Sequence, residues 1–507
     1  MTPSVSAEKS PEKEFIENDR PMHDAYMEYL ELCETFQGKR LKKLIRKVDS
    51  RIVFPLIMCY LLSYIDRSNV ANAKLFGALS DLHMTGQQWN TALSVFFVSY
   101  AVMAPVSNMA LNKVGARFWV PLLLMLVAVV QICAGVQSSY GGWVAFRFLL
   151  GVVEAGIYPG CSVILSTWYS PEEVHTRMAF FYSASSCSGA FSGLLAYAIG
   201  GSLDHTWGYR GWRFIYVIEA VATFCMGVIA FFVVIDHPEN AGRWISDDER
   251  RYLSLRSQFS RGKGTGVSED SGFSWSAAWE SCKSPHVWVL TLIHLLLVTP
   301  TYGLSFSLPT MINNLGFSAA KAQAMTAPPY VFACLVCVVS GILADRYQKR
   351  MPIICLPSIM SLAGFIIIMV TVRYPNLTGV TLLGIFLAAG GLYPVSPTLN
   401  AWISQNQAGA SKRAVSIGIV FMGSCLSGLI GSNIYLPDED PTYPTGFGIS
   451  IAFIAVGGWA CPVLYWLWLK RLNAKRATIS EEEIRATYTE EELVQMGDKS
   501  PLFRFQT

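Results

Sequence analysis

The chain alternates long apolar runs with short polar breaks. Twelve of these runs are long enough to cross a bilayer as a helix, since about 20 residues span roughly 30 Å of hydrocarbon. They lie near residues 52–72, 89–111, 118–137, 142–165, 178–200, 212–235, 287–311, 325–344, 352–372, 379–402, 414–435 and 447–469. One break, 236–286, is much longer than the others. The pattern predicts an all-α integral membrane protein with twelve transmembrane helices.

The composition agrees with this pattern and excludes a soluble protein. Of the 507 residues, 52% are hydrophobic and 15% are charged, whereas soluble chains carry about 25% charged residues. The net charge of +3 does not indicate a nucleic-acid partner, and we expect the helices to contact membrane lipid instead. The 12 cysteines have no zinc-type spacing and lie mostly in apolar runs, so we expect buried free thiols, no metal and no cofactor.

Lysine and arginine gather before the first apolar run and after the second, eighth, tenth and twelfth runs. These clusters lie at 39–51, 113–117, 346–350, 412–413 and 470–476. Because cytosolic loops carry the excess of cations, both termini are predicted to be cytosolic. The segment before the first run is hydrophilic, so we expect no signal peptide. We expect the protein to lie in the plasma membrane.

The chain contains a duplicated unit. The stretch EAGIYPGCSVILSTW at 154–168 matches AGGLYPVSPTLNAWI at 389–403 at a constant offset, which pairs Tyr158 with Tyr393. We therefore predict two pseudo-symmetric six-helix halves. The predicted organisation is an N-terminal cytosolic tail at 1–50, a first half at 51–235, a cytosolic linker at 236–286, a second half at 287–470 and a C-terminal cytosolic tail at 471–507.

Glycine and proline interrupt the fourth and tenth runs at matching positions, 155–160 and 390–397. In secondary transporters, broken helices at equivalent positions of two repeats point to a binding site near the bilayer midplane. Such glycines also allow close helix packing, and the two roles can coexist. Tyr158 and Tyr393 lie beside the breaks, so they are candidates to line a substrate site or to pack in the core.

Three ionisable residues lie deep inside apolar runs. Asp66 and Arg67 interrupt the first run and Glu154 the fourth, at a cost of roughly 2.5–3.5 kcal/mol each on the lenient insertion scale. A structural ion pair between Glu154 and either Arg67 or Arg147 is one explanation, and a proton relay is another. We favour an anion site, in which Arg67 binds a carboxylate while Asp66 and Glu154 carry the proton.

The stretch GILADRYQKR at 341–350 resembles the cytosolic loop signature of the major facilitator superfamily. The resemblance implies that Asp345 and Arg350 form part of a conformational latch and do not bind substrate. The first copy, NMALNKVGAR at 108–117, has asparagine in place of the acid and keeps Arg117 as the counterpart of Arg350. We expect a weaker latch in that half.

Further stretches resemble the anion:cation symporter family. They are RFLLGVVEAGIYPG at 147–160, WYSPEEVHTR at 168–177 and YIDRSNVANAK at 64–74. Stretches at 210–220, 236–249 and 302–331 resemble its fungal branch, which contains permeases for allantoate, nicotinate and pantothenate. The resemblance covers roughly residues 50–470. It implies that Arg67 meets a substrate carboxylate, that Glu154 assisted by Asp66 couples the proton, and that Arg147 acts in gating or pairing.

Weaker candidates lie on the sixth and seventh runs. His294 and Tyr302 face the substrate region by analogy with the family, although a lone histidine is also a common helix contact. Glu219 fits a family motif, and we expect it to tie helices together.

These features predict a secondary active transporter that moves a small organic anion, a carboxylate such as a vitamin or ureide, together with a proton. It would work by alternating access, as a monomer. An exporter of an acidic metabolite and a transport-inactive nutrient sensor on the same fold are the alternatives. A membrane enzyme would need a catalytic cluster such as HExxH, which the sequence does not contain, so we expect no enzymatic activity.

Overall fold

The computed structural model describes residues 20–242, 244–259, 275–347, 349–407, 410–489, 493 and 496–506. Within these residues the regular structure is entirely helical, which confirms the predicted all-α class. The start of the predicted N-terminal tail and the middle of the predicted linker lie outside the described residues.

Every predicted span falls on one helix or on consecutive helical segments. In the first half these are α4 (Phe54–Leu75), α6 (Gly86–Val114), α7 (Ala116–Gly135), α8 (Tyr140–Glu154), α9 (Ile157–Trp168), α10 (Pro171–Leu203) and α11 (Gly211–Val233). In the second half they are α14 (Pro285–Asn314), α15 (Ala319–Tyr347), α16 (Met351–Thr371), α17 (Thr378–Leu392), α18 (Val395–Gln405), α19 (Ala410–Gly431), α20 (Pro444–Ala455), η6 (Val456–Ala460) and α21 (Cys461–Arg476). Outside the spans lie α2 (Arg20–Thr35), α3 (Gly38–Val48), η1 (Asp49–Val53), α5 (Ala78–Asp81), η2 (Thr206–Gly208), η3 (Pro238–Asn240), α12 (Asp247–Phe259), α13 (Trp275–Lys283), η4 (Pro375–Leu377), η5 (Pro437–Glu439), α22 (Glu481–Thr487) and η7 (Gly497–Lys499).

Ten helical stretches of the described chain are long and apolar enough to cross a membrane. The predicted fifth and eleventh spans, on α10 and α19, are not among these ten: the described apolar stretch of α19, Val415–Gly431, is shorter than the others, and α10 is less apolar. In α10 the cause is serine, and Ser185, Ser186, Ser188 and Ser192 are nearly fully buried. The hydroxyls of Ser185 and Ser188 donate to carbonyl oxygens of their own helix, so these two buried hydroxyls are satisfied within α10.

The helix of the first span begins before the predicted span. α3 continues through the π-helical turn η1 into α4, so that one helix runs from Gly38 to Leu75. Asp49 in the turn accepts hydrogen bonds from Tyr169 Oη at 2.7 Å and from Arg177 Nε at 3.1 Å. These bonds fix the polar start of the first span to the ends of the fourth and fifth.

The predicted breaks in the fourth and tenth spans are present. α8 and α9 are separated at 155–156, and α17 and α18 at 393–394. A Cβ atom at Gly156 would overlap a side chain of α6, and one at Gly391 would overlap the backbone of α16. Both glycines therefore allow close helix packing, which is one of the two roles expected of them.

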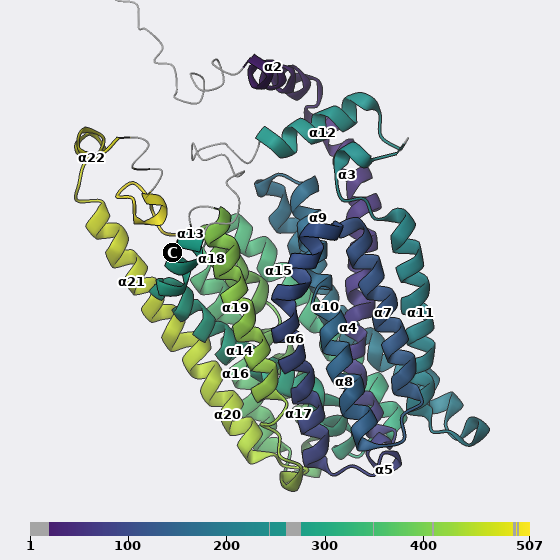
Figure 1. The fold of residues 1–507 in the computed structure, drawn as a ribbon. Helices are drawn as coiled ribbons and strands as arrows, with labels where there is room; N and C mark the ends of the chain where they lie inside the picture. The colour runs from purple at the N-terminus through teal and green to yellow at the C-terminus, as the bar shows by residue number, and fades with distance from the viewer. Residues whose placement is uncertain are drawn as a thin grey trace, which may run out of the picture.

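The two halves form separate bundles that lie side by side (Figure 1). The purple-to-blue helices of the first half lie on the right of Figure 1 and the green-to-yellow helices of the second half on the left. The bundles meet through α10 with α15, α6 with α19 and α4 with α14. Each half contributes most of one buried hydrophobic cluster, so each has a core of its own.

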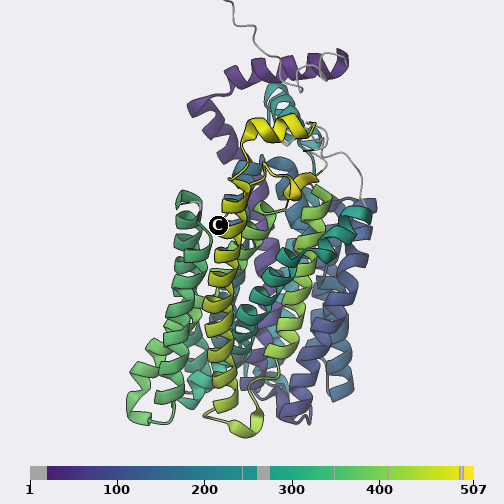
Figure 2. The same ribbon diagram turned by 90° about the vertical axis from the view of Figure 1, so that its left-hand side faces the viewer.

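The elements outside the spans mostly gather at one end of the bundles, which we call the tail end; the opposite end, where α5 lies, is the loop end. Figures 1 and 2 both place α2, α12 and the C-terminal segment at the tail end. Arg251 of α12 donates two hydrogen bonds to Glu28 of α2, at 2.8 and 2.7 Å. On the second half, Lys412 Nζ lies 2.5 Å from Asp498 Oδ1 of the C-terminal segment. Both terminal segments are thus fixed to the tail end by ion pairs.

Candidate functional site

The deepest predicted charges meet in the first half. Arg67 Nε of α4 donates a hydrogen bond to Glu154 Oε1 of α8 across 2.6 Å. Ser63 Oγ, one turn earlier on α4, donates to the same oxygen at 3.3 Å. In this conformation Arg67 therefore neutralises Glu154, as expected if the two form an ion pair between the first and fourth spans.

Aromatic rings surround the Arg67 guanidinium. Its central carbon lies 5.0 Å from the ring centroid of Tyr64, 5.2 Å from that of Phe96 and 4.9 Å from that of Tyr100. The faces of such rings attract a desolvated cation. The Arg67 side chain keeps 10% of its surface exposed and Glu154 only 2%, so the guanidinium is the more accessible partner.

The second arginine of the site, Arg147, makes no ion pair with Glu154 in this conformation. Arg147 is fully buried, and its guanidinium carbon lies 4.7 Å from the Phe96 ring centroid. None of its three guanidinium nitrogens has a hydrogen-bond partner among the described residues. The same holds for both carboxylate oxygens of Asp66, which is also fully buried. The charges of Arg147, Arg67 and Glu154 all act on Asp66, so the four predicted residues form one electrostatic cluster.

Tyr158 and Tyr302 lie where the two halves meet. The Tyr158 ring stacks on that of Phe421 of α19, with centroids 5.5 Å apart and planes at 10°. Tyr302 of α14 packs edge-on against Phe97 of α6 at 4.9 Å. Both tyrosines are partly exposed. These two predicted substrate residues therefore occupy positions that a relative motion of the halves would change.

Tyr393 and His294 lie inside the second half. The Tyr393 hydroxyl lies 3.2 Å from Ser305 Oγ, and the residue is 8% exposed. His294 Nε2 lies 3.0 Å from Ser396 Oγ, while its Nδ1 has no partner in the described part of the chain. In this conformation both residues pack as core contacts, and their role in substrate binding stays a prediction.

The predicted latch residues lie near the tail end. Arg350 Nε donates to Gln405 Oε1 at the end of α18 at 3.0 Å. The Arg117 guanidinium lies 5.5 Å from the ring centroid of Phe118. Asp345 belongs to α15, and the contacts of its side chain lie outside the described residues. The latch therefore stays a prediction.

Sequence reasoning missed the aromatic residues around Arg67. Tyr64 could have been found, because it precedes Arg67 by three residues and so shares its helix face. Phe96 and Tyr100 lie on α6, and nothing in their own segment distinguishes them from other apolar positions. Only the packing of α6 against α8, which brings the two rings to the Arg67 guanidinium, identifies them.

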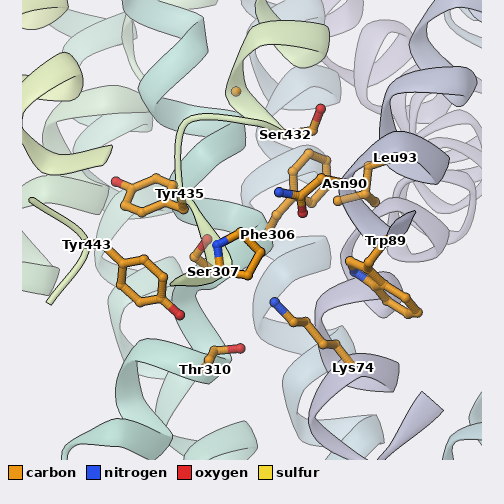
Figure 3. A pocket seen from close by; sticks show the side chains of 12 residues that line it. Lys74, Trp89, Asn90, Leu93, Phe306, Ser307, Thr310, Ser432, Tyr435 and Tyr443 are labelled. Carbon is orange, nitrogen blue, oxygen red and sulfur yellow. The ribbon is translucent and has the colours of Figure 1, made fainter. Parts of the chain in front are cut away.

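A pocket lies at the loop end of the seam between the halves (Figure 3). Lys74 and Asn90 of the first half and Thr310 and Tyr443 of the second are among its lining residues. Nearby, Asn433 Nδ2 of the second half donates to Ser94 Oγ of the first at 2.8 Å. This hydrogen bond joins the halves on the loop-end side of Arg67.

Comparisons with known proteins agree with this architecture. The Major Facilitator Superfamily profile matches residues 56–432. "MFS-type transporter cnsO" of Penicillium expansum is 42% identical over 487 residues, which cover 95% of this chain and 93% of that protein. The high-affinity nicotinic acid transporter of Saccharomyces cerevisiae is 28% identical over 470 residues, covering 92% and 84%. The solved structure of the proton:xylose symporter XylE bound to 6-bromo-6-deoxy-D-glucose covers 82% of this chain and 96% of its own, with a TM-score of 0.62 at 14% identity.

The chain belongs to the major facilitator superfamily. This confirms the predicted fold and the predicted class, a multi-pass membrane transport protein. The likeness to XylE shows the fold alone. The anion:cation symporter branch, the carried anion and the proton coupling stay predictions.

Proposed function

We propose that this protein is a proton-coupled symporter of a small organic anion, of the anion:cation symporter branch. The observation that carries the proposal is the contact between Arg67 and Glu154. It places a guanidinium whose side chain is 10% exposed against an acid whose charge a proton can remove. An arginine is well suited to bind a carboxylate, because its planar fork matches the two oxygens.

In this mechanism the substrate replaces Glu154 as the counter-ion of Arg67. A proton on Glu154 weakens its hold on the guanidinium, and the substrate carboxylate then docks there. The bound anion in turn favours the protonated form of the neighbouring acid. One proton and one anion therefore load together with little change in net charge. When the proton leaves, Glu154 pairs with Arg67 again and the anion is released.

Because each half has its own hydrophobic core, the halves can move relative to each other, as alternating access requires. The halves rock about the central site, and the contacts of Tyr158 and Tyr302 across the seam change as they do so. Tyr393 and His294 would line the site from the second half. Asp66 assists proton transfer, Arg147 acts in gating or pairing, and the residues at 117, 345 and 350 form the latch.

The relatives support a carboxylate substrate. One of them is a nicotinic acid transporter, and nicotinic acid is an aromatic carboxylic acid. The rings of Tyr64, Tyr100 and Tyr302 near Arg67 suit a planar organic anion. A vitamin or a ureide is the class we expect.

The clusters of lysine and arginine support a cytosolic tail end. We infer a monomer in the plasma membrane that takes up its anion from an acidic exterior. The same site would export an acidic metabolite if the gradients were reversed, since the direction of a symporter is set by its gradients.

Uptake of labelled nicotinate, pantothenate, allantoate and related carboxylates by cells that express the protein tests the proposal. Uptake is expected to rise as the external pH falls and to collapse with a protonophore. Arg67→Ala should abolish it, and Glu154→Gln should abolish proton-driven uptake while anion exchange continues. Arg373→Ala, at an exposed loop-end arginine, is the matched control. Uptake that changes neither with external pH nor with a protonophore would contradict proton coupling. Full uptake by the Arg67→Ala variant would contradict the proposed carboxylate site.

A further inference from the structure

A third buried carboxyl, Glu219 of α11, lies beside the cluster of Arg67 and Glu154. The residue is 3% exposed. Asn69 Nδ2 of α4 donates a hydrogen bond to Glu219 Oε2, and Oε1 has no hydrogen-bond partner among the described residues. Within the same residues Glu219 makes no ion pair. Its direct partner is therefore a neutral amide.

A directional chain of hydrogen bonds fixes the orientation of Asn69. Asn72 Nδ2 donates to Ser192 Oγ at 2.6 Å, and Ser192 Oγ in turn donates to Asn69 Oδ1 at 2.9 Å. The Asn69 amide nitrogen is left to face Glu219. All three residues are almost fully buried. Glu219 Oε2 is thus held as an acceptor, while Oε1 is left as the oxygen that can carry a proton.

The charged and titratable groups that act around Glu219 come from α4, α8 and its own helix. From α4, Asp66 feels the charge of Glu219. From α8, Arg147 acts on Tyr216, which precedes Glu219 by one turn of α11 and also feels Asp66. On the sides of α7 and α10, the buried polar groups are the Gln131 amide and the serine hydroxyls. No cation therefore lies in direct contact with Glu219 in the described structure.

The buried cluster needs one bound proton to be electrically neutral. With every acid ionised, three negative and two positive charges give a net charge of −1. An uncompensated buried charge is costly, and one proton makes the empty cluster neutral. Glu154 pairs with the Arg67 guanidinium and the charge of Arg147 acts on Asp66, whereas Glu219 has a neutral amide as its partner. The groups counted are the acids Asp66, Glu154 and Glu219 and the guanidiniums of Arg67 and Arg147.

We propose that Glu219 is a neutral carboxylic acid that keeps a resident proton on Oε1 and donates it in a hydrogen bond toward Asp66. Ordered water would bridge them, since buried waters hydrogen-bond to polar groups that lack a protein partner. The consequence for transport rests on the proposed function. Because the empty cluster starts neutral, each monocarboxylate that binds at Arg67 takes up one further proton. Glu219 is thus a positioning residue that sets the charge balance, and the coupled proton binds elsewhere.

Infrared spectroscopy of the purified full-length protein in lipid membranes tests this proposal without any substrate. A neutral carboxyl has a C=O stretching band that an ionised carboxylate lacks. The wild type should keep one such band above neutral pH, where exposed acids are ionised. Glu219→Gln should remove the band and Glu219→Asp should shift it. Glu31→Gln, at an exposed position of α2, should leave it unchanged.

Three results would overturn the proposal. They are the absence of a neutral-carboxyl band above neutral pH, a band that survives Glu219→Gln, and a clear loss of thermal stability in Glu219→Gln. A loss of stability would contradict the proposal because glutamine has the same charge and nearly the same shape as a neutral glutamic acid, so the substitution should leave the stability unchanged. Because no anion is present in this experiment, a negative result would not contradict the proposed carboxylate site at Arg67. Conversely, if the protein transports no carboxylate, the neutral-carboxyl band of Glu219 would still be present.

Discussion

The Nε of Arg67 donates its hydrogen to the carboxylate of Glu154 across 2.6 Å, and this bond joins the first and fourth spans inside the first bundle. Glu154 is almost fully buried and Arg67 nearly so. Each group compensates the charge of the other. Removing either one alone therefore leaves a charge inside the protein. A proton can neutralise Glu154 when Arg67 is missing, and a substrate carboxylate can pair with Arg67 when Glu154 is missing.

Arg67→Ala is expected to destabilise the protein because it leaves Glu154 unpaired. Removing one partner of a buried ion pair costs about 3–5 kcal/mol. A proton can neutralise Glu154, so the loss should shrink as the pH falls. Unfolding temperatures of the purified variants at acidic and alkaline pH provide the measurement. The double variant Arg67→Ala/Glu154→Gln should recover most of the loss at alkaline pH, and equal instability of single and double variants at both pH values would contradict this.

Oxidation should cross-link the two halves through Cys187 and Cys334. Their sulfur atoms lie 3.4 Å apart, on α10 of the first half and α15 of the second. A disulfide requires an S–S distance of about 2.05 Å, so a small approach joins them. If the halves rock during transport, a membrane-permeable oxidant should block most of the uptake and a reductant should restore it. Cys187→Ser is the control, and a cross-linked protein with undiminished uptake would argue against rocking at this seam.

Two glycines of α17 should respond to alanine in opposite ways. A Cβ atom at Gly391 would overlap the Pro357 carbonyl oxygen, whereas nothing lies within 4 Å of one at Gly379. Overpacking costs about 1–3 kcal/mol, and alanine is favoured over glycine in a helix by about 1 kcal/mol. Thermal unfolding should therefore show Gly391→Ala below the wild type and Gly379→Ala at or above it. Equal stability of the two variants would be inconsistent with the close approach of α16 and α17.

Acid should loosen α2 from α12. The hydrogen bond from Arg251 holds the pKa of Glu28 below its ordinary value. A depressed carboxyl pKa contributes stability above the unfolded-state pKa, about 4.3 for glutamate, and this contribution is lost as the pH falls through the folded-state pKa. Both side chains are well exposed, and exposed ion pairs contribute about 0.2–1 kcal/mol. Hydrogen exchange of 20–35, corrected for intrinsic rates, should thus rise by at most about fivefold below pH 4. Glu28→Gln should show the faster exchange already at neutral pH, and no difference between the two proteins would refute the contact.

Much of the fold could be predicted because its main determinants are local. Long apolar runs specify spanning helices, and the match of 154–168 with 389–403 specifies the duplication. The helix breaks followed from glycine and proline. The start of the first helix was harder to predict, because Gly38–Val48 is strongly charged and becomes helical as an extension of the span. The serine-rich α10 shows that a span inside a bundle need not be strongly apolar.

The site could be predicted in part. The buried charges Asp66, Arg67 and Glu154 were found from the cost of placing them in hydrocarbon. Which arginine pairs with Glu154 was left open, because it depends on the rotation of α4 against α8. The contact between Asn69 and Glu219 was not anticipated, although Glu219 was expected to tie helices together. Contacts between distant segments depend on packing angles that a single sequence does not contain.

The competition between Glu154 and the substrate for Arg67 is tested most directly by carboxylate binding to the purified protein across a range of pH. The wild type should bind more tightly as the pH falls and Glu154 takes up a proton. Glu154→Gln should bind tightly at every pH above the pKa of the carboxylate itself, because its amide does not compete for the guanidinium. Wild-type binding that does not change with pH, or loss of binding in Glu154→Gln, would contradict the account.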